Sequence, residues 1–175
     1  MKRPLLTLIR DRRGVSAVEF ALLAPLMIAF YFGLAEFCQG FMAQKRVGHI
    51  ASVVADLVSQ VDEIDAGEMA DIFSVGDLVM RPFPSDPLRQ RVSSVRMRAN
   101  GRAEVDWSRG AGMAARGAGS AVDLPAGLLA DGESLIMAEA SYDYDSPVDY
   151  LLPALTRFEQ VYYLRPRRVD HISFR

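Results

Sequence analysis

The sequence predicts an α+β protein in which one long N-terminal helix packs against a small antiparallel β-sheet. Two patterns predict this architecture. Residues 15–62 have the pattern of a helix that is apolar on every face in its first part and along a single stripe in its second part. From residue 93 onward, apolar residues instead alternate with polar ones, as in half-buried strands. A chain of 175 residues suits one compact domain with appendages, so we expect a single globular head.

An uncharged segment, residues 20–35, predicts a helix that crosses a membrane. With residues 15–19 it reaches about 20 residues, the length that spans ~30 Å of hydrocarbon. A soluble core helix seldom stays apolar on all faces over this length. A cleaved secretory signal would be shorter and followed by small residues, whereas bulky aromatic residues continue here. We therefore assign residues 15–37 as a retained anchor, in which Pro25 predicts a local kink.

The charges around the anchor predict its orientation. Five basic residues and one acidic residue give the first 14 residues a charge of +4, which leaves −6 for the rest of the chain. The positive-inside rule places this N-terminal segment in the cytoplasm and residues 63–175 on the opposite side of the membrane. A remainder of charge −6 is poorly suited to phosphate backbones, so nucleic acid is not an expected partner.

Glu19 is the unusual residue of the apolar segment, because a charge at mid-bilayer costs about 2.5 to 3.5 kcal/mol on insertion scales. One interpretation is an interfacial glutamate that reaches back to the headgroups. The second depends on its neighbours. A basic run ends at Gly14, and Glu19 and the aromatic Phe20 follow at the fifth and sixth positions after that glycine.

The whole string, RDRRGVSAVEFALLAPLMIAF, resembles the prepilin leader of the tight-adherence (Tad) pilus system, and specifically that of TadE-like minor pilins or pseudopilins. The resemblance implies that a membrane-embedded prepilin peptidase cuts after Gly14, so that residues 1–14 form a cytoplasmic leader and Val15 becomes the N-terminus. It also implies that Glu19 is recognised and pairs with the freed amino group of a neighbouring subunit. Major pilins of this system usually carry Tyr where Phe20 stands, a departure that removes a hydroxyl and keeps the ring.

The resemblance further implies a pilin-like fold and a role in pilus assembly or adhesion. The implied partners are the prepilin peptidase, other pilins or pseudopilins, the Tad assembly machinery and the lipid bilayer of the bacterial inner membrane, with the head in the periplasm. Weaker similarity extends into the head, at residues 93–109, 139–147 and 165–167. Helices in lipid associate through small residues and polar pairs, so we expect neighbouring helices at Glu19, Pro25, Gly33 and Ala35.

Two other classes of protein remain open. One is an uncleaved membrane-anchored periplasmic enzyme or ligand-binding domain, which a compact pocket with convergent titratable groups would favour. The other is a subunit of a secretion pseudopilus, which shares the leader and differs in its partners.

Beyond the anchor, residues 38–62 continue the helix in amphipathic form. The apolar stripe that we expect to lie on the head is spaced by three and four residues and consists of Val47, Ile50, Val54, Leu57 and Val61. A coiled coil is the alternative, although only about two heptads fit it. Residues 68–80 predict a short helix or a turn-rich element. Pro82, Pro84 and Pro87 then predict an irregular extended linker.

The dipeptide Asn100-Gly101 predicts a β-hairpin. A three-residue loop, residues 99–101, sets the apolar Met97 against Ala103, whereas a two-residue turn would set Met97 against Glu104. The three-residue loop is therefore predicted. Residues 110–127 are rich in Gly and Ala and predict a mobile surface loop. Further strands are expected at residues 134–144 and 158–164.

No pattern in the chain predicts chemistry. Asp143, Asp145 and Asp149 could supply oxygen ligands to calcium, but they lack the spacing of a calcium loop, and solvated strand-end charges are the simpler interpretation. The other reactive side chains, His49, His171 and Cys38, belong to no zinc or catalytic motif. We therefore expect no enzymatic activity, no metal and no cofactor.

The basic segment near the C-terminus has two interpretations. Arg165, Arg167 and Arg168 could contact a partner or anionic lipid headgroups, or they could form a solvated basic tail. The sequence favours the solvated tail.

Overall fold

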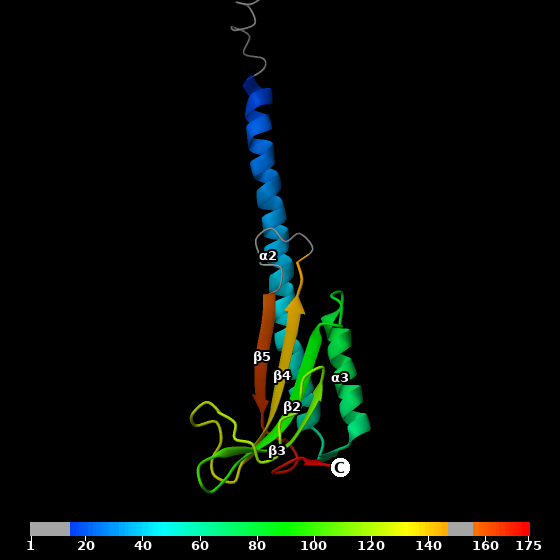
Figure 1. Cartoon of the computed structure of the whole chain (residues 1–175), viewed down its shortest axis with the longest axis vertical. Coiled ribbons are helices and arrows are strands. Elements are labelled where there is room, and N and C mark those ends of the chain that lie inside the picture. The colour runs from blue at the N-terminus through cyan, green and yellow to red at the C-terminus, as the bar shows by residue number, and fades with distance from the viewer. Residues whose placement is uncertain (1–14, 147–155) are drawn as a thin grey trace, which may run out of the picture.

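The computed structural model describes residues 15–146 and 156–175. The predicted leader and residues 147–155, which include Asp149, lie outside the described residues. Figure 1 shows a long helix whose upper half projects from the head and whose lower half lies beside a shorter helix and a curved sheet. The predicted α+β, pilin-like fold, with a long helix against an antiparallel sheet, is confirmed.

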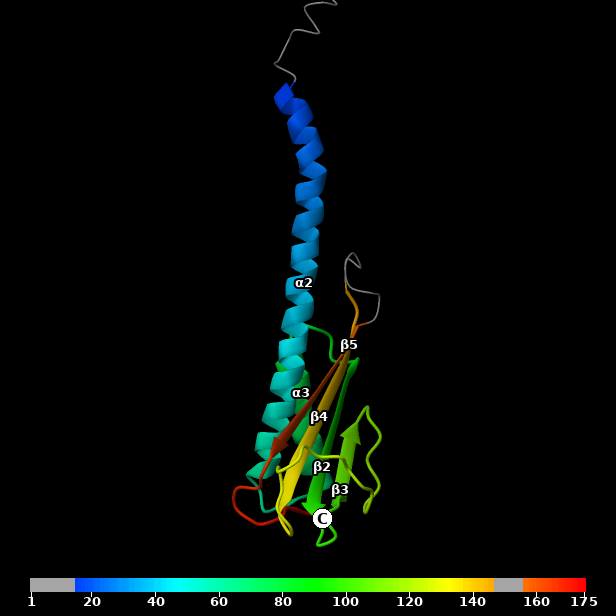
Figure 2. The ribbon, with the colours of Figure 1, turned by 90° about the vertical axis from the view of Figure 1, so that its left-hand side faces the viewer.

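Helix α2, Val15–Ser59, is the axis of the molecule. Its N-terminal half stands alone and its C-terminal half lies against the sheet (Figures 1 and 2). The helix continues through Pro25 without a break, so the expected kink interrupts no helical turn. It ends at Ser59, slightly before the expected end at residue 62.

The buried stripe of α2 differs from the prediction in its last turn. Val47, Ile50 and Val54 are buried as expected, but the next buried valine is Val58, while Leu57 is only half-buried. At 3.6 residues per turn, a residue three positions after Val54 rotates away from the sheet, and one four positions after it returns. Leu57 is therefore wrongly placed on the stripe and Val58 takes its position, whereas Val61, the last predicted residue, lies half-buried against the core.

The sheet has four antiparallel strands in the order β3-β2-β4-β5. Their bounds are β2 Leu88–Met97, β3 Ala103–Ala111, β4 Ser134–Tyr144 and β5 Thr156–Leu164. The bounds predicted for β4 are confirmed, and β5 begins two residues before its predicted start at residue 158. Helix α2 covers the inner face of the sheet, mainly over β4 and β5.

The hairpin between β2 and β3 has the predicted register. Met97 lies opposite Ala103. The N–H of Arg98 donates to the carbonyl of Arg102 at 2.9 Å, and Gly101 adopts a φ of 72°, which suits a residue without a side chain. The three-residue loop is confirmed.

Residues 68–80, predicted as either a short helix or a turn-rich element, belong to a helix, α3, Ala66–Met80. Asp65 caps it, because its Oδ1 accepts from the N–H groups of Gly67 at 2.7 Å and Glu68 at 2.8 Å, and Glu68 bonds back to the N–H of Asp65. Arg46 then ties α2 to α3 by donating to the carbonyl of Val79 at 2.6 Å. The proline-rich linker before β2 is irregular, as predicted.

Gly76 sets the distance between α3 and the sheet. A Cβ at this position would lie 2.4 Å from Oε1 of Gln90, a buried side chain of β2. The Gln90 carboxamide in turn donates to the carbonyl of Phe73 at 3.0 Å. Gly76 therefore allows the contact that fixes α3 on the sheet.

The sheet is buried on both faces in its lower half. Its inner face packs on α2 and α3 in the main core. Its outer face forms a second cluster, closed by the segment between β3 and β4, whose core residues are Val95, Ala103, Val105, Leu129, Leu135 and Met137. The predicted loop, residues 110–127, is wrong at its start, because residues 110 and 111 end strand β3. Residues 112–127 carry no helix or long strand, and together with residues 128–133 they cover an apolar surface instead of only lying in solvent.

The C-terminal segment ties the base of the head together. The N–H of Arg167 donates to the carbonyl of Ser59 at 3.0 Å, and the Arg167 guanidinium pairs with Asp56. Arg165 pairs with Glu133 at 2.8 Å. The segment lies at the end of the head away from the exposed apolar helix (Figure 1), and Arg165 and Arg167 form ion pairs while their side chains stay more than half exposed. The contact with a partner or with lipid headgroups stays a prediction.

A short two-stranded sheet completes this base. Strands β1, Glu63–Ile64, and β6, Ser173–Phe174, pair in parallel. Next to them, Nε1 of Trp107 donates to the carbonyl of Ile172 at 2.7 Å in the buried core. The last residues of the chain are thus part of the core.

We expect Gly76→Ala to lower the free energy of unfolding by about 1 kcal/mol. Alanine favours a helix over glycine by up to ~1 kcal/mol, but the steric conflict with Gln90 costs about 1 to 3 kcal/mol. Chemical denaturation of the detergent-solubilised chain measures the difference. In a Gln90→Ala background the same substitution should stabilise, and equal effects in both backgrounds would contradict the proposed contact. Gly117→Ala, with nothing within 4 Å of its Cβ, is the control.

Candidate functional site: the exposed helix and its junction with the head

The N-terminal half of α2 exposes apolar side chains on all sides. Phe20 and Leu22 are each 73% exposed, and the other large apolar residues up to Phe32 are at least 45% exposed. The most apolar window of 18 residues is not buried anywhere. A core helix of a soluble protein would be mostly covered, so this helix requires an apolar environment outside the chain. It is the single candidate membrane span in the described residues.

The predicted site residues fall into two groups on this helix. Val15, Glu19, Phe20 and Pro25 are exposed and open to lipid or to another helix. Gly33 is buried and Ala35 is half-buried, so the single chain already covers much of these two positions. Gly14 lies outside the described residues. The proposed roles of all these residues stay predictions.

The exposed apolar face continues past the predicted end of the anchor. Leu34, Phe37, Phe41 and Met42 are 49–59% exposed. The rings of Phe37 and Phe41 stack with centroids 6.3 Å apart, and Nζ of Lys45 lies 5.3 Å from the Phe41 centroid. At ~1.5 Å per residue the apolar face from Val15 to Met42 is about 40 Å long, against ~30 Å of hydrocarbon.

Glu36 marks the junction of the helix with the head. Its side chain is 0% exposed, and its Oε1 accepts a hydrogen bond from Oγ of Ser146 at 2.7 Å. Because Ser146 follows β4, this bond joins residues 110 positions apart and fixes the membrane-proximal end of the sheet to the helix. Burying a carboxylate costs free energy unless it is hydrogen-bonded, so the bond from Ser146 stabilises this junction.

Tyr144 lies in the same polar cluster. Burial raises the pKa of its hydroxyl above the ordinary value, and the Glu36 and Asp145 carboxylates raise it further, which together outweigh the opposing effect of the nearby Ser146. The hydroxyl therefore stays protonated at neutral pH.

In the sequence, Glu36 is the charged residue that ends the uncharged segment 20–35, and this position alone predicts no role for it. The sequence does contain a signal for the position of Glu36, because it belongs to a series of residues spaced by three and four. The series consists of Gly33, Glu36, Gly40, Ala43 and Val47. That spacing places Glu36 on the stripe that faces the head.

The comparison with protein families bears directly on this helix. Residues 14–56 match the family model of TadE-like proteins. The match begins at Gly14 and spans the exposed helix, the Glu36 junction and most of the buried stripe. The predicted TadE-like resemblance is therefore confirmed for this segment, and residues 57–175 lie outside the match. No curated protein and no solved structure matches the chain.

On the outer face of the sheet, the face opposite α2, Glu139 is held by two arginines. Arg91 donates to its two oxygens at 2.6 and 2.7 Å, and Arg116 donates at 2.9 and 3.3 Å. Burial works against the ionised carboxyl, but the hydrogen bonds and charges of Arg91 and Arg116 outweigh it and lower the pKa of Glu139. Arg116 thereby fixes the segment after β3 to the sheet.

Of the calcium candidates, Asp143 is engaged in other interactions, and Asp145 is exposed. Asp143 accepts from Arg157 at 2.6 Å and from Arg89 at 3.2 Å, and the hydrogen bond from Arg157 lowers the pKa of its carboxyl. Asp149 lies outside the described residues. Within residues 15–146 and 156–175, no three His, Cys, Asp or Glu side chains converge to hold a metal ion.

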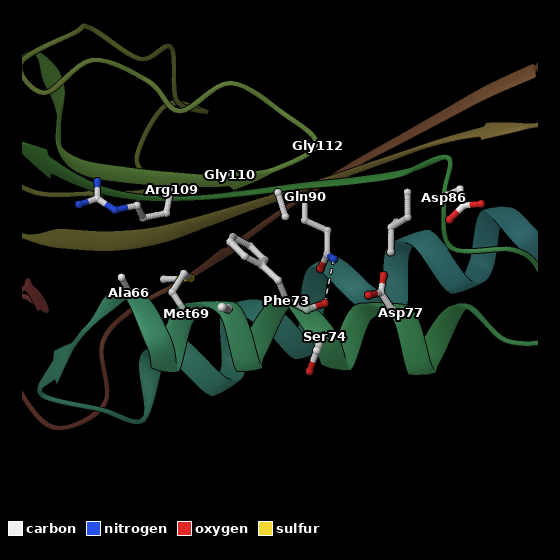
Figure 3. A pocket seen from close by; sticks show the side chains of 13 residues that line it. Ala66, Met69, Phe73, Ser74, Asp77, Asp86, Gln90, Arg109, Gly110 and Gly112 are labelled. Carbon is white, nitrogen blue, oxygen red and sulfur yellow. Dashed lines mark hydrogen bonds between the residues drawn. The ribbon is translucent and has the colours of Figure 1, made fainter.

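A hollow of about 600 Å³ in the head lies between α3 and the ends of β2 and β3 (Figure 3). Met69 and Phe73 line it, and its charged groups are Asp77, Asp86 and Arg109. Figure 3 shows Arg109 and Asp86 at opposite ends of this hollow. His49, His171 and Cys38 are exposed and lie elsewhere. This hollow thus holds no convergent set of titratable groups.

We expect Ser146→Ala to lower the free energy of unfolding by about 1 to 3 kcal/mol, because it removes a donor from the buried Glu36 carboxylate. Thermal unfolding of the full chain in detergent measures this effect. Ser52→Ala is the matched control, since its exposed hydroxyl bonds only to the nearby carbonyl of His49. Equal effects of the two substitutions would contradict the structural role of the junction.

Glu139→Gln should destabilise the chain at pH 7, and the difference from the native chain should shrink in acid. A carboxyl whose pKa is lowered by folding stabilises the protein above its unfolded pKa of about 4.3, and this contribution disappears as pH falls through the folded value. Denaturation midpoints between pH 7 and pH 3 measure it. A difference that stays constant over this range would show that ionised Glu139 contributes nothing.

Proposed function

We propose that this chain is a minor pilin or pseudopilin of a Tad-type pilus that a prepilin peptidase processes after Gly14. The observation that carries the proposal is the TadE-like match, which begins at Gly14 and includes Glu19 and Phe20. The exposed apolar helix supports it, because a pilin-type subunit needs a helix that is stable in lipid and also available to neighbouring subunits.

The proposed location is the bacterial inner membrane, with the N-terminus in the cytoplasm and the head in the periplasm. The excess of basic residues before the span supports this orientation. A single candidate span in the described residues is compatible with it. After processing, Val15 carries a free amino group at the cytoplasmic end of the helix, and Glu19 lies one turn further along.

The proposed action is helix-to-helix packing with other pilins or pseudopilins during pilus assembly or adhesion. The apolar face is about 10 Å longer than the hydrocarbon layer, so an upright helix leaves Phe37 and Phe41 outside it. A neighbouring helix would cover these rings. Packing at Glu19 would also pair its carboxylate with the amino group of a neighbour, which lowers the cost of a charge in lipid.

We propose no chemistry for the head itself. The rival function, an uncleaved anchored enzyme or ligand-binding domain, has the 600 Å³ hollow in its favour. Asp77 and Asp86 in that hollow are exposed, which is unlike the buried, perturbed groups of a catalytic site. A secretion pseudopilus subunit would share the helix and the cleavage and would differ in its copurifying partners.

We expect the mature protein to begin at Val15 when it is expressed with its prepilin peptidase, and to retain the leader without the peptidase. Gly14→Val should abolish cleavage, because the peptidase needs an unhindered bond. Intact mass and N-terminal sequencing of the membrane-extracted protein give the answer. Cys38→Ser serves as the control that should be cleaved normally.

Glu19→Gln tests whether the peptidase recognises Glu19, separately from the test of Gly14. If Glu19 is recognised, as we propose, cleavage falls although Gly14 is intact. An intact leader in the native chain in the presence of the peptidase would overturn the proposed processing and leave the anchored enzyme or ligand-binding domain as the better explanation.

A further inference from the structure

The two edges of the four-stranded sheet differ in how they are covered. On the β3 edge, the N–H of Val105 donates to the carbonyl of Ser120 at 3.0 Å, and the N–H of Gly119 donates to the carbonyl of Val105 at 2.7 Å. The N–H of Val122 adds a bond to the carbonyl of Ala103 at 2.9 Å. The segment after β3 thus blocks the start of this edge.

The β5 edge has no such cover among the described residues. From Arg157 to Leu164, the strand pairs with β4, and no other described backbone group bonds to it. In an antiparallel strand, every second residue directs its N–H and C=O to the free edge. Natural sheets protect edges of this kind because they recruit other strands.

Apolar side chains are also exposed along this edge. Val161 on the outer face is 44% exposed, and Tyr162 on the inner face is 43% exposed. Two hollows of about 410 and 320 Å³ run between β5 and α2 and share Ser52 and Tyr162, so they form one groove beside the strand. An added strand would cover both side chains and satisfy the open backbone.

The groove also carries an unpaired charge. Lys45 lines its upper part and has no ion-pair partner in the described residues. At the lower end, the charge of Arg167 is already paired with Asp56. A segment that carries a carboxylate opposite Lys45 and a small or apolar residue over Tyr162 would complement this surface.

From these observations we propose that β5 accepts an extended segment of a different subunit as a fifth strand of the sheet, in the groove beside α2. The proposal rests on the proposed membrane anchoring, because anchoring restricts how a second copy of this chain can approach. The partner is recognised by its extended backbone and by an acidic residue placed opposite Lys45.

A second copy fits this edge poorly. β5 runs in the same direction as α2 (Figure 1), so antiparallel pairing of two β5 strands would point the two anchors in opposite directions. The other edge of a second copy begins with residues 103–105, which the segment after β3 already covers. These two constraints favour a different chain as the source of the strand.

The test places a photoreactive benzoylphenylalanine at Glu159 or at Val161 in the full chain, in cells that assemble the pilus. Both side chains lie on the outer face of β5, two residues apart. If a strand is added, both probes crosslink the same partner, and the attachment site on that partner shifts by about two residues between them. Mass spectrometry of the adduct locates each attachment.

Controls keep the proposal falsifiable. The same probe at Leu78, a 59% exposed residue on α3, gives the background, and Tyr162→Lys should lower the adduct yield from Val161 several-fold without shifting the melting temperature. Adducts no stronger than at Leu78, adducts with a second copy, or scattered attachment sites would overturn the proposal. The N-terminal mass from the same preparation reports processing at Val15, so failure of the proposed function is seen separately.

Discussion

A single helix of 45 residues has to be stable in two different surroundings, and the rest of the structure follows from how its surface is divided between them. Its first half exposes apolar side chains on every face and gains stability only from lipid or other helices. Its second half buries one stripe against the sheet. Glu36 lies where one condition gives way to the other, and its bond to Ser146 fixes the sheet at that level.

The buried stripe determines how closely the sheet approaches. Gly40, Ala43, Ala51 and Ala55 alternate with larger apolar residues along the buried face of α2. Small side chains let the strands pack close to the helix axis, and the larger ones fill the space between strands. Gly76 has the same effect on α3, where the Gln90 side chain occupies the place of a Cβ. The head is thus assembled around close backbone approaches.

The outer face of the sheet is stabilised by a different set of interactions. Near the membrane it carries charged pairs such as Asp143 with Arg157, and further down Glu139 binds Arg91 and Arg116. Below these, the segment after β3 covers a second apolar cluster. This arrangement blocks part of the β3 edge and leaves β5 open, so the same segment that completes the core also decides which edge of the sheet can accept a partner.

The sequence by itself determined the features that depend on local periodicity. The anchor, the hairpin register around Asn100-Gly101 and the bounds of β4 follow from spacing, turn chemistry and alternation, which act over a few residues. The leader motif likewise predicted the TadE-like resemblance, which the match over residues 14–56 confirmed.

Only the tertiary structure decided the contacts between distant segments. No local pattern joins Glu36 to Ser146 or Arg167 to Asp56, because each bond depends on where the strands and the C-terminal segment come to lie against α2. The loop after β3 is rich in glycine and alanine, which predicts a surface loop, yet its leucines fill an apolar surface that exists only once the sheet has formed. Packing of surfaces brought together by the whole fold is the physical reason that these features could not be read from the chain alone.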